Sequence, residues 1–151
     1  MSKIIETISI KAPATDVWRA VHEDLDNVNL WAKNLSKAES LSGDNPGQGS
    51  RLRFTMILPG GKEIKLVLRQ SVFTPHRRCA GEIVEGPIGG TWSWEYRERN
   101  GVTQLTYTVE LKIGGLLRVI AGVISDQYEK GTRETLVALK AYVESDLQKV
   151  G

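Results

Sequence analysis

The sequence predicts an α+β fold in which a curved antiparallel sheet of seven strands wraps around one long C-terminal helix. Two observations lead to this prediction. As far as residue 113, apolar and polar residues mostly alternate, which is the period of β-strands. After Gly114-Gly115 the period becomes helical and stays helical to the end. The sheet must bury its apolar face, and this helix is the one large element left to cover it.

The N-terminal segment predicts one strand followed by two short helices. Residues 3–11 alternate, and the pattern breaks at Ala12-Pro13. Pro13 suits the first turn of a helix, and apolar residues follow it at four-residue spacing. A second helical turn is predicted near residues 26–30. We expect His22 to end the first of these helices, where the helix dipole favours a cation.

Six further strands are predicted to follow, joined by turns that contain glycine. Their ranges are 34–41, 51–57, 62–73, 77–84, 90–99 and 102–113. The alternation does not decide which face of the strand at 77–84 points inward. The apolar stripe of the C-terminal helix does not stay in phase with residues 116–123, so we expect a separate turn or a kink near Gly122.

The last hairpin predicts an aromatic strip on the inner face of the sheet. Asn100-Gly101 is a preferred pair for a two-residue hairpin turn, and it fixes the register of the two strands. Counting back from this turn pairs Tyr96 with Leu105, Trp94 with Tyr107, and Trp92 with Val109. The opposite face then carries polar and charged side chains, which suits contact with water.

The width of this sheet predicts a cavity of ligand size beneath the helix. One helix is about 10–12 Å in diameter and covers only part of the inner face. Aromatic residues with polar tips, and Gly131 near the helix stripe, favour a cavity over a filled core. The alternative is that long side chains fill the gap. The candidate ligand-binding residues are Phe54, Leu66, Leu68, Trp92, Trp94, Tyr96, Tyr107, Val109, Ile124 and Tyr128.

Several segments are similar to one known group of proteins. They are IKAPATDVWRAV at 10–21, Trp31, GDNPGQGSRLRF at 43–54, the alternating residues 100–111, and LVALKAYVE at 136–144. Together they resemble the polyketide cyclase/dehydrase group of the START-like superfamily, also called Bet v 1-like or SRPBCC. The resemblance implies a helix-grip fold with a hydrophobic cavity between sheet and helix. Members include ring-closing enzymes, lipid or quinone carriers, plant ligand binders and chaperone activators, so the fold alone does not fix the function.

Length, charge and cysteine content predict a single cytoplasmic domain, residues 1–151. The chain has 20 basic and 18 acidic residues in interspersed order, which argues against nucleic acid as a partner. One cysteine, Cys79, allows no internal disulfide, and the N-terminus lacks the apolar stretch of a secretory signal. The most apolar window, residues 114–124, is shorter than the ~20 residues that span a bilayer. We therefore expect no membrane span.

No metal or cofactor site is predicted. His22 and His76 lie in different predicted elements, with no cysteine or carboxylate at ligand spacing. The glycine-rich segment 43–50 joins two strands and lacks the Lys-Ser/Thr of a phosphate-binding loop. Glu6 has the parity of the inward-facing residues, so it is either a buried acid/base candidate or a carboxylate at a strand end in solvent. Arg118 either lies at the cavity mouth, where it would attract an acidic ligand, or is a surface residue.

Three functions remain open from the sequence. The leading hypothesis is binding of a small hydrophobic or aromatic ligand of polyketide, lipid or quinone type in the cavity. The first alternative is a polyketide cyclase/dehydratase, although the sequence shows no catalytic dyad. The second is a protein-partner module, as in the chaperone activators, that uses the outer-face residues Arg51, Arg53, Lys65 and Arg69. The ligand's identity and the oligomeric state stay open.

Overall fold

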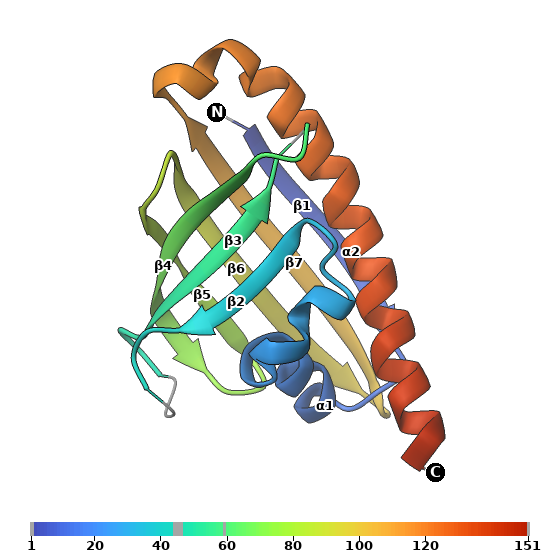
Figure 1. Ribbon diagram of the computed structural model, residues 1–151. Helices are drawn as coiled ribbons and strands as arrows, with labels where there is room; N and C mark the ends of the chain where they lie inside the picture. The colour runs from blue at the N-terminus through green and yellow to red at the C-terminus, as the bar shows by residue number, and fades with distance from the viewer. Residues whose placement is uncertain (1, 44–46, 59, 151) are drawn as a thin grey trace.

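Seven antiparallel strands form one curved sheet in the computed structural model (Figure 1). The structure describes residues 2–43, 47–58 and 60–150, without the side chains of Ser2, Leu116 and residues 146–150. Part of the glycine-rich segment, residues 44–46, and Pro59 of the predicted turn therefore lie outside the described residues. The strands are β1 (Ser2–Ile10), β2 (Leu35–Ser40), β3 (Arg51–Ile57), β4 (Glu63–Thr74), β5 (Arg78–Glu85), β6 (Ile88–Arg99) and β7 (Val102–Ile113). Their ranges confirm the predicted α+β order within a few residues at each end.

The strand order is β1-β7-β6-β5-β4-β3-β2, so each later strand pairs with its predecessor and β1 closes against β7. The β6–β7 hairpin has the predicted register, because Trp92 opposes Val109, Trp94 opposes Tyr107 and Tyr96 opposes Leu105. At its turn, Asn100 and Gly101 have φ angles of 53° and 78°. These positive angles are what a tight hairpin turn requires and what this pair of residues tolerates.

The structure decides the orientation of β5, which the alternation left open. Cys79 opposes Trp94 and Gly81 opposes Trp92, so both of these β5 residues lie on the inner face. On its other side, Gly81 opposes Gln70 of β4. The pairing of β4 with β5 shifts its register after Gln70. The β4 residue that lies before Val72 has no partner on β5. Because of this local irregularity, counting alternate residues from β4 into β5 does not show which β5 side chains face inward.

Two short helical segments follow β1 and close one end of the sheet (Figure 1). The first begins as α1 (Ala14–Trp18) and continues as a π-helical turn, η1 (Arg19–Glu23); the second is a 3-10 segment, η2 (Leu25–Leu30). Pro13 precedes the first helical residue, as predicted. The amide of Ala14 donates to the carboxylate of Glu98 on β6 at 2.6 Å. This bond satisfies one of the free N–H groups at the start of α1 and joins it to the sheet.

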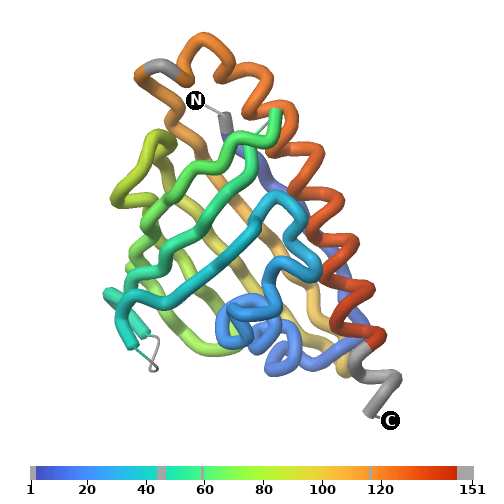
Figure 2. Tube along the Cα trace, viewed as in Figure 1, coloured from blue at the N-terminus to red at the C-terminus, as the bar shows by residue number. Residues whose placement is uncertain are grey.

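The C-terminal helix α2 (Ala121–Val150) crosses the open side of the sheet (Figures 1 and 2). A separate 3-10 segment, η3 (Gly115–Ile120), precedes it, which confirms the change of phase predicted near Gly122. Three polar contacts hold α2 beside the first strand. Arg133 pairs with Glu6 at 2.8 Å, Lys140 donates to the Ser9 carbonyl at 2.8 Å, and Glu144 accepts from the Lys11 amide at 2.8 Å.

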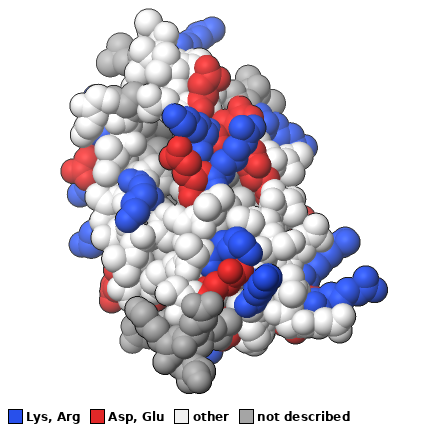
Figure 3. Space-filling view, turned by 90° about the vertical axis from the view of Figure 1, so that its right-hand side faces the viewer, with Lys and Arg blue, Asp and Glu red and all other residues white. Residues whose placement is uncertain are grey.

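The hydrophobic core lies between the inner face of the sheet, the segments after β1, and α2. Trp18, Leu105 and Leu139 represent these three layers and are almost fully buried. On the side of the molecule that α2 forms, basic and acidic side chains lie close together rather than in blocks of one sign (Figure 3). Within the described residues, no helix combines the length and apolar character needed to cross a membrane.

Candidate functional site

A small void lies between the inner face of the sheet and α2; we call it the inner chamber. Its volume is about 60 Å³. The sheet contributes Trp94 and Tyr107, and α2 contributes residues spaced about one helical turn apart. The third wall is the segment from the end of η2 to the start of β2. The full lining is Trp31, Ala32, Asn34, Leu35, Trp94, Tyr107, Tyr128, Thr132, Thr135 and Leu136.

Aromatic rings with polar tips line one side of the inner chamber. Trp94 and Tyr107 are cross-strand partners, and their ring centroids lie 4.2 Å apart at an angle of 35°. The hydroxyls of Tyr107 and Tyr128 are 2.8 Å apart and share a hydrogen bond. Burial raises the pKa of both phenols, so both stay protonated at neutral pH. Trp31, in contrast, has a buried indole N–H with no hydrogen-bond partner among the described residues.

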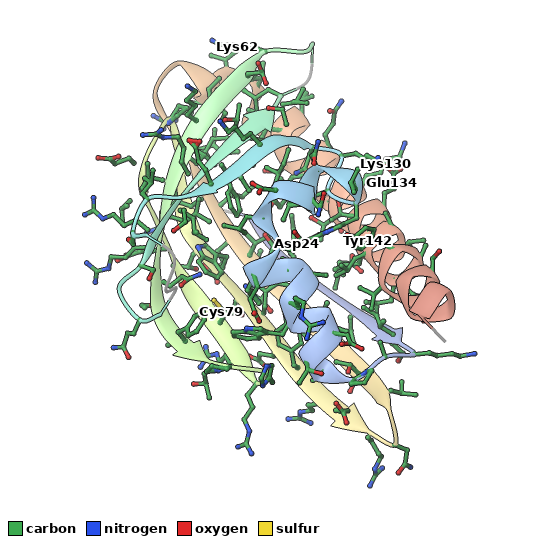
Figure 4. The ribbon with its side chains drawn as sticks, turned by 60° about the horizontal axis from the view of Figure 1, so that its bottom comes forward. Asp24, Lys62, Cys79, Lys130, Glu134 and Tyr142 are labelled. Atoms are coloured by element: carbon green, nitrogen blue, oxygen red, sulfur yellow. The ribbon has the colours of Figure 1, made fainter. Side chains whose placement is uncertain are left out.

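A larger hollow, which we call the outer depression, adjoins the inner chamber. Its volume is about 400 Å³, and its walls are polar: Lys33, Asn34, Gln127, Lys130, Gly131, Glu134 and Thr135. Asn34 and Thr135 line both hollows, so the two lie side by side. Lys130 and Glu134 lie on α2 beside the segment that joins η2 to β2 (Figure 4). Both hollows thus lie between α2 and the segment that contains Asn34.

The inner chamber is smaller than the predicted cavity. Pockets for drug-sized ligands measure about 300–1,000 Å³, and the inner chamber, at about 60 Å³, is far below this. The prediction of an enclosed cavity of ligand size is therefore wrong in its dimensions. The physical reason is that α2 is not the sheet's only cover. The segments after β1 also cover the inner face, and Trp18, Val21, Val28 and Trp31 from these segments are buried in the core.

Three of the ten candidate residues line the inner chamber: Trp94, Tyr107 and Tyr128. Six others belong to the surrounding hydrophobic core without lining this void. They are Phe54, Leu66, Leu68, Trp92, Val109 and Ile124. Tyr96 lies elsewhere: its hydroxyl bonds to Nε2 of His22 at 2.7 Å, beneath the segments that follow β1.

His22 belongs to a buried aromatic cluster at that end of the sheet. Its ring lies 4.2 Å from Trp18 and 5.8 Å from Tyr96, measured between centroids. Burial lowers the pKa of His22 to about 3, so the ring is neutral at physiological pH. The expectation of a cation at the helix end is therefore wrong. The side chain points into the core, where an imidazolium ion would lose its hydration.

Several residues of the inner chamber were not among the candidates. On α2, Thr132 and Leu136 follow Tyr128 at four-residue spacing, so this spacing could have identified them. Ala32, Asn34 and Leu35 lie in a short irregular segment between η2 and β2. No periodic pattern marks such a segment, so its contact with α2 comes only from the fold.

The other residues singled out in the sequence have structural surroundings. Glu6 faces α2 and forms the ion pair with Arg133. Arg118 is exposed on η3 and lines neither hollow. Cys79 is buried, and burial raises its thiol pKa to about 12, which keeps it unreactive at neutral pH. Among the described residues, no three His, Cys, Asp or Glu side chains form a group able to hold a metal ion.

The outer face offers little to distinguish a partner site from ordinary solvation. Arg51 and Arg69 are exposed and oppose each other on β3 and β4. Arg53 forms an ion pair with Glu39 at 3.2 Å. Lys65 is exposed on β4. Such mixed charge on a solvated sheet face is typical of soluble surfaces and does not indicate a partner.

Comparison with known proteins agrees with this architecture. The family described as "Polyketide cyclase / dehydrase and lipid transport" matches residues 1–144. No curated protein matches the chain. Among solved structures, the Zhui aromatase/cyclase from a Streptomyces species has a TM-score of 0.78 at 19% identity, covering 99% of this chain and 98% of its own. A Thermus thermophilus protein has a TM-score of 0.80 at 15% identity, covering 96% and 99%. A START superfamily protein from Mycobacterium smegmatis has 0.77 at 14%, covering 95% and 97%. At these identities the neighbours show the shared fold alone.

Proposed function

Because this chain belongs to the polyketide cyclase/dehydrase and lipid transport family, we propose that it binds a small aromatic molecule between the sheet and α2. The observation that carries the proposal is the composition of the inner chamber. One void is lined by Trp31, by Trp94, and by Tyr107 and Tyr128, whose hydroxyls share a hydrogen bond. Flat apolar walls with a few polar groups are typical of sites that orient a ring.

Size requires that the ligand occupy both hollows. The ring enters the inner chamber, which widens to take it, while the rest of the molecule lies in the outer depression near Lys33 and Lys130. The contacts of α2 support such opening. Arg133, Lys140 and Glu144 fasten the helix on the β1 side, whereas the hollows lie on the side of residues 31–35. A small rotation about the β1 contacts widens the inner chamber without breaking them.

Binding is favoured over cyclisation by the chemistry of the chamber wall. Enolisation of a polyketone needs a general base with a pKa near the working pH. The titratable groups among the described chamber residues are Tyr107 and Tyr128, and burial raises the pKa of both. Protonated phenols donate hydrogen bonds to a ligand oxygen but do not accept its proton. The same wall therefore suits recognition better than proton transfer.

A substitution that fills part of the outer depression tests this proposal. The probe is 2-naphthol, titrated into the protein by calorimetry. The change is Gly131→Trp, at a wall of the outer depression, and the matched control is Gly122→Trp, an exposed glycine of the same helix outside both hollows. We expect saturable binding of one equivalent to the wild type. We also expect at least about a tenfold weaker affinity in Gly131→Trp, because the indole fills part of the outer depression, and an unchanged affinity in the control.

A second variant examines the hydroxyl pair. Tyr107→Phe keeps the ring and removes one phenol. The probe for this variant is 2,6-dihydroxynaphthalene, whose second hydroxyl reaches the tyrosine pair, and its affinity should fall by about fivefold through the loss of one hydrogen bond. The melting temperature should change little if this tyrosine serves the ligand rather than the core. Equal affinities of the wild type, Gly131→Trp and Tyr107→Phe would contradict binding at this site.

A further inference from the structure

Gln70 carries a buried amide that lines neither the inner chamber nor the outer depression. Its exposed fraction is 0%, and neither its Oε1 nor its Nε2 has a hydrogen-bond partner among the described residues. Trp92 is also buried, and its indole N–H likewise lacks a partner there. An unsatisfied buried amide or indole N–H is costly, and native structures rarely retain one without a reason. Two such side chains on one face of the sheet call for a common explanation.

The sheet register places these two side chains in one row, on either side of Gly81. Gln70 opposes Gly81, and Gly81 opposes Trp92, so the three form one inner-face row across β4, β5 and β6. The middle residue has no side chain, and the Trp92 ring takes its space. A Cβ at Gly81 would lie 2.7 Å from Cζ2 of Trp92. In indole, Cζ2 belongs to the six-membered ring, so this ring of Trp92 lies over Gly81.

This row borders the site proposed above. Trp92 lies two residues before Trp94 on β6, and Val109 lies two residues after Tyr107 on β7. Successive inner-face rows are therefore about 7 Å apart along the strands. A ring that rests against Trp94 and extends one row along the sheet brings a substituent to Gln70 and Trp92.

We propose that Gln70 and Trp92 form a polar subsite that receives a hydroxyl group of the aromatic ligand. This inference rests on the proposed function and narrows its ligand class to hydroxylated rings. The chemistry follows from the groups present. A hydroxyl oxygen accepts from the Trp92 N–H or the Gln70 amide, and its hydrogen is donated to Gln70 Oε1. A ketone on the ligand leaves Oε1 of Gln70 without a donor, and a hydrocarbon leaves Gln70 and Trp92 without any partner. The subsite therefore binds a ligand with a ketone or a hydrocarbon group at this position more weakly than one with a hydroxyl.

A pair of probes of nearly equal shape tests the subsite: 2-naphthol and 2-methylnaphthalene. The measured quantity is the ratio of their dissociation constants, which cancels the shared contribution of the ring. Gln70→Leu removes both polar atoms and keeps the approximate side-chain volume. We expect this variant to reduce the preference for 2-naphthol by about tenfold relative to the wild type. Its melting temperature should rise, because an unsatisfied amide is replaced by an apolar group.

Two further variants make the test specific. Gln104→Leu, on the exposed outer face of β7, should leave the ratio at its wild-type value. Trp92→Phe removes the other N–H and should lower the ratio in the same direction as Gln70→Leu. In nitrogen-15 spectra of the wild type, the Trp92 indole signal should move with 2-naphthol and stay in place with 2-methylnaphthalene.

A buried water offers the same hydrogen bonds as a hydroxyl group, and the two sources give different results. If water alone satisfies Gln70, its replacement by leucine changes the melting temperature but not the ratio, and the proposal is overturned. If neither probe binds the wild type, the proposed function fails and the subsite with it. If both probes bind and the wild type shows no preference that depends on Gln70, the subsite alone fails.

Discussion

At the scale of single residues, burial separates the roles of the polar aromatic side chains. Tyr107 and Tyr128 bond to each other beside the inner chamber, whereas Tyr96 bonds to His22 away from it. The sequence places Tyr96 and Tyr107 on the same inner face and gives no means to tell them apart. The difference arises from what covers each one: α2 over Tyr107, and the segments after β1 over Tyr96.

His22 predicts a specific loss of stability in mild acid. Its pKa is about 3 in the folded protein and about 6.5 when unfolded. Between pH 6.5 and pH 3 the imidazole of His22 is protonated in the unfolded chain but neutral in the folded protein. The free energy of unfolding is therefore highest above pH 6.5 and falls as the pH drops below that value. From pH 7 to pH 5 the free energy of unfolding should decrease by about 2 kcal/mol. Urea denaturation at the two pH values measures this change.

The control for this effect is His22→Gln, an uncharged side chain that also offers hydrogen-bonding atoms to Tyr96. Glu39 and Glu144 also have lowered pKa values, but they are protonated only below their ordinary value of 4.5, outside this pH range. The variant should therefore lose much less stability than the wild type between pH 7 and pH 5. An equal loss in both proteins would show that His22 is not the group responsible.

At the scale of elements, the tightest constraint lies where β4, β5 and β6 run side by side. A Cβ at Gly81 would clash with the carbonyl of Arg69 and lie 2.7 Å from the Trp92 ring. Any side chain there pushes β4 and β6 apart or expels the indole. The closeness of Gln70 and Trp92, on which the polar subsite depends, is therefore a property of three strands rather than of one residue.

Gly81→Ala should destabilise the protein by about 3 kcal/mol, the cost of overpacking against backbone that does not move freely. Gly122→Ala is the matched control, since a Cβ there meets no atom within 4 Å and the residue lies inside α2. That change should stabilise the protein by up to about 1 kcal/mol, because alanine favours the helix over glycine. Chemical denaturation of both variants gives the comparison. Similar stabilities for the two would contradict the close packing inferred at Gly81.

The same elements show how far the sequence alone leads. Alternation and Asn100-Gly101 predict the strands and the β6–β7 register, because these depend on neighbours in the chain. The walls of the inner chamber depend on contacts between segments far apart in sequence. Trp31 lines the same void as Thr132 and Leu136, which lie about a hundred residues later in the chain. Such contacts are set by the packing of the whole fold, so neither the chamber's volume nor the burial of His22 follows from a local pattern.

At the scale of the whole molecule, two adjacent hollows of very different character lie between α2 and the rest of the fold. The inner one is aromatic and small, about 60 Å³, and the outer one is polar and open, about 400 Å³. A guest with an aromatic end and a polar end matches this arrangement. The Zhui aromatase/cyclase and the START superfamily protein share this architecture, so the fold alone does not identify a ligand.

The four tryptophans of this chain provide the most direct test of binding between the sheet and α2. Trp31 and Trp94 line the inner chamber, whereas Trp18 is buried against Phe73 and His22 at the other end of the core. The measurement is a titration of nitrogen-15 labelled protein with 2-naphthol, following the indole signals. The account predicts saturable shifts of Trp31 and Trp94, with one equivalent bound and Trp18 unchanged. Unmoved Trp31 and Trp94 signals, or an equal shift of Trp18, would contradict it.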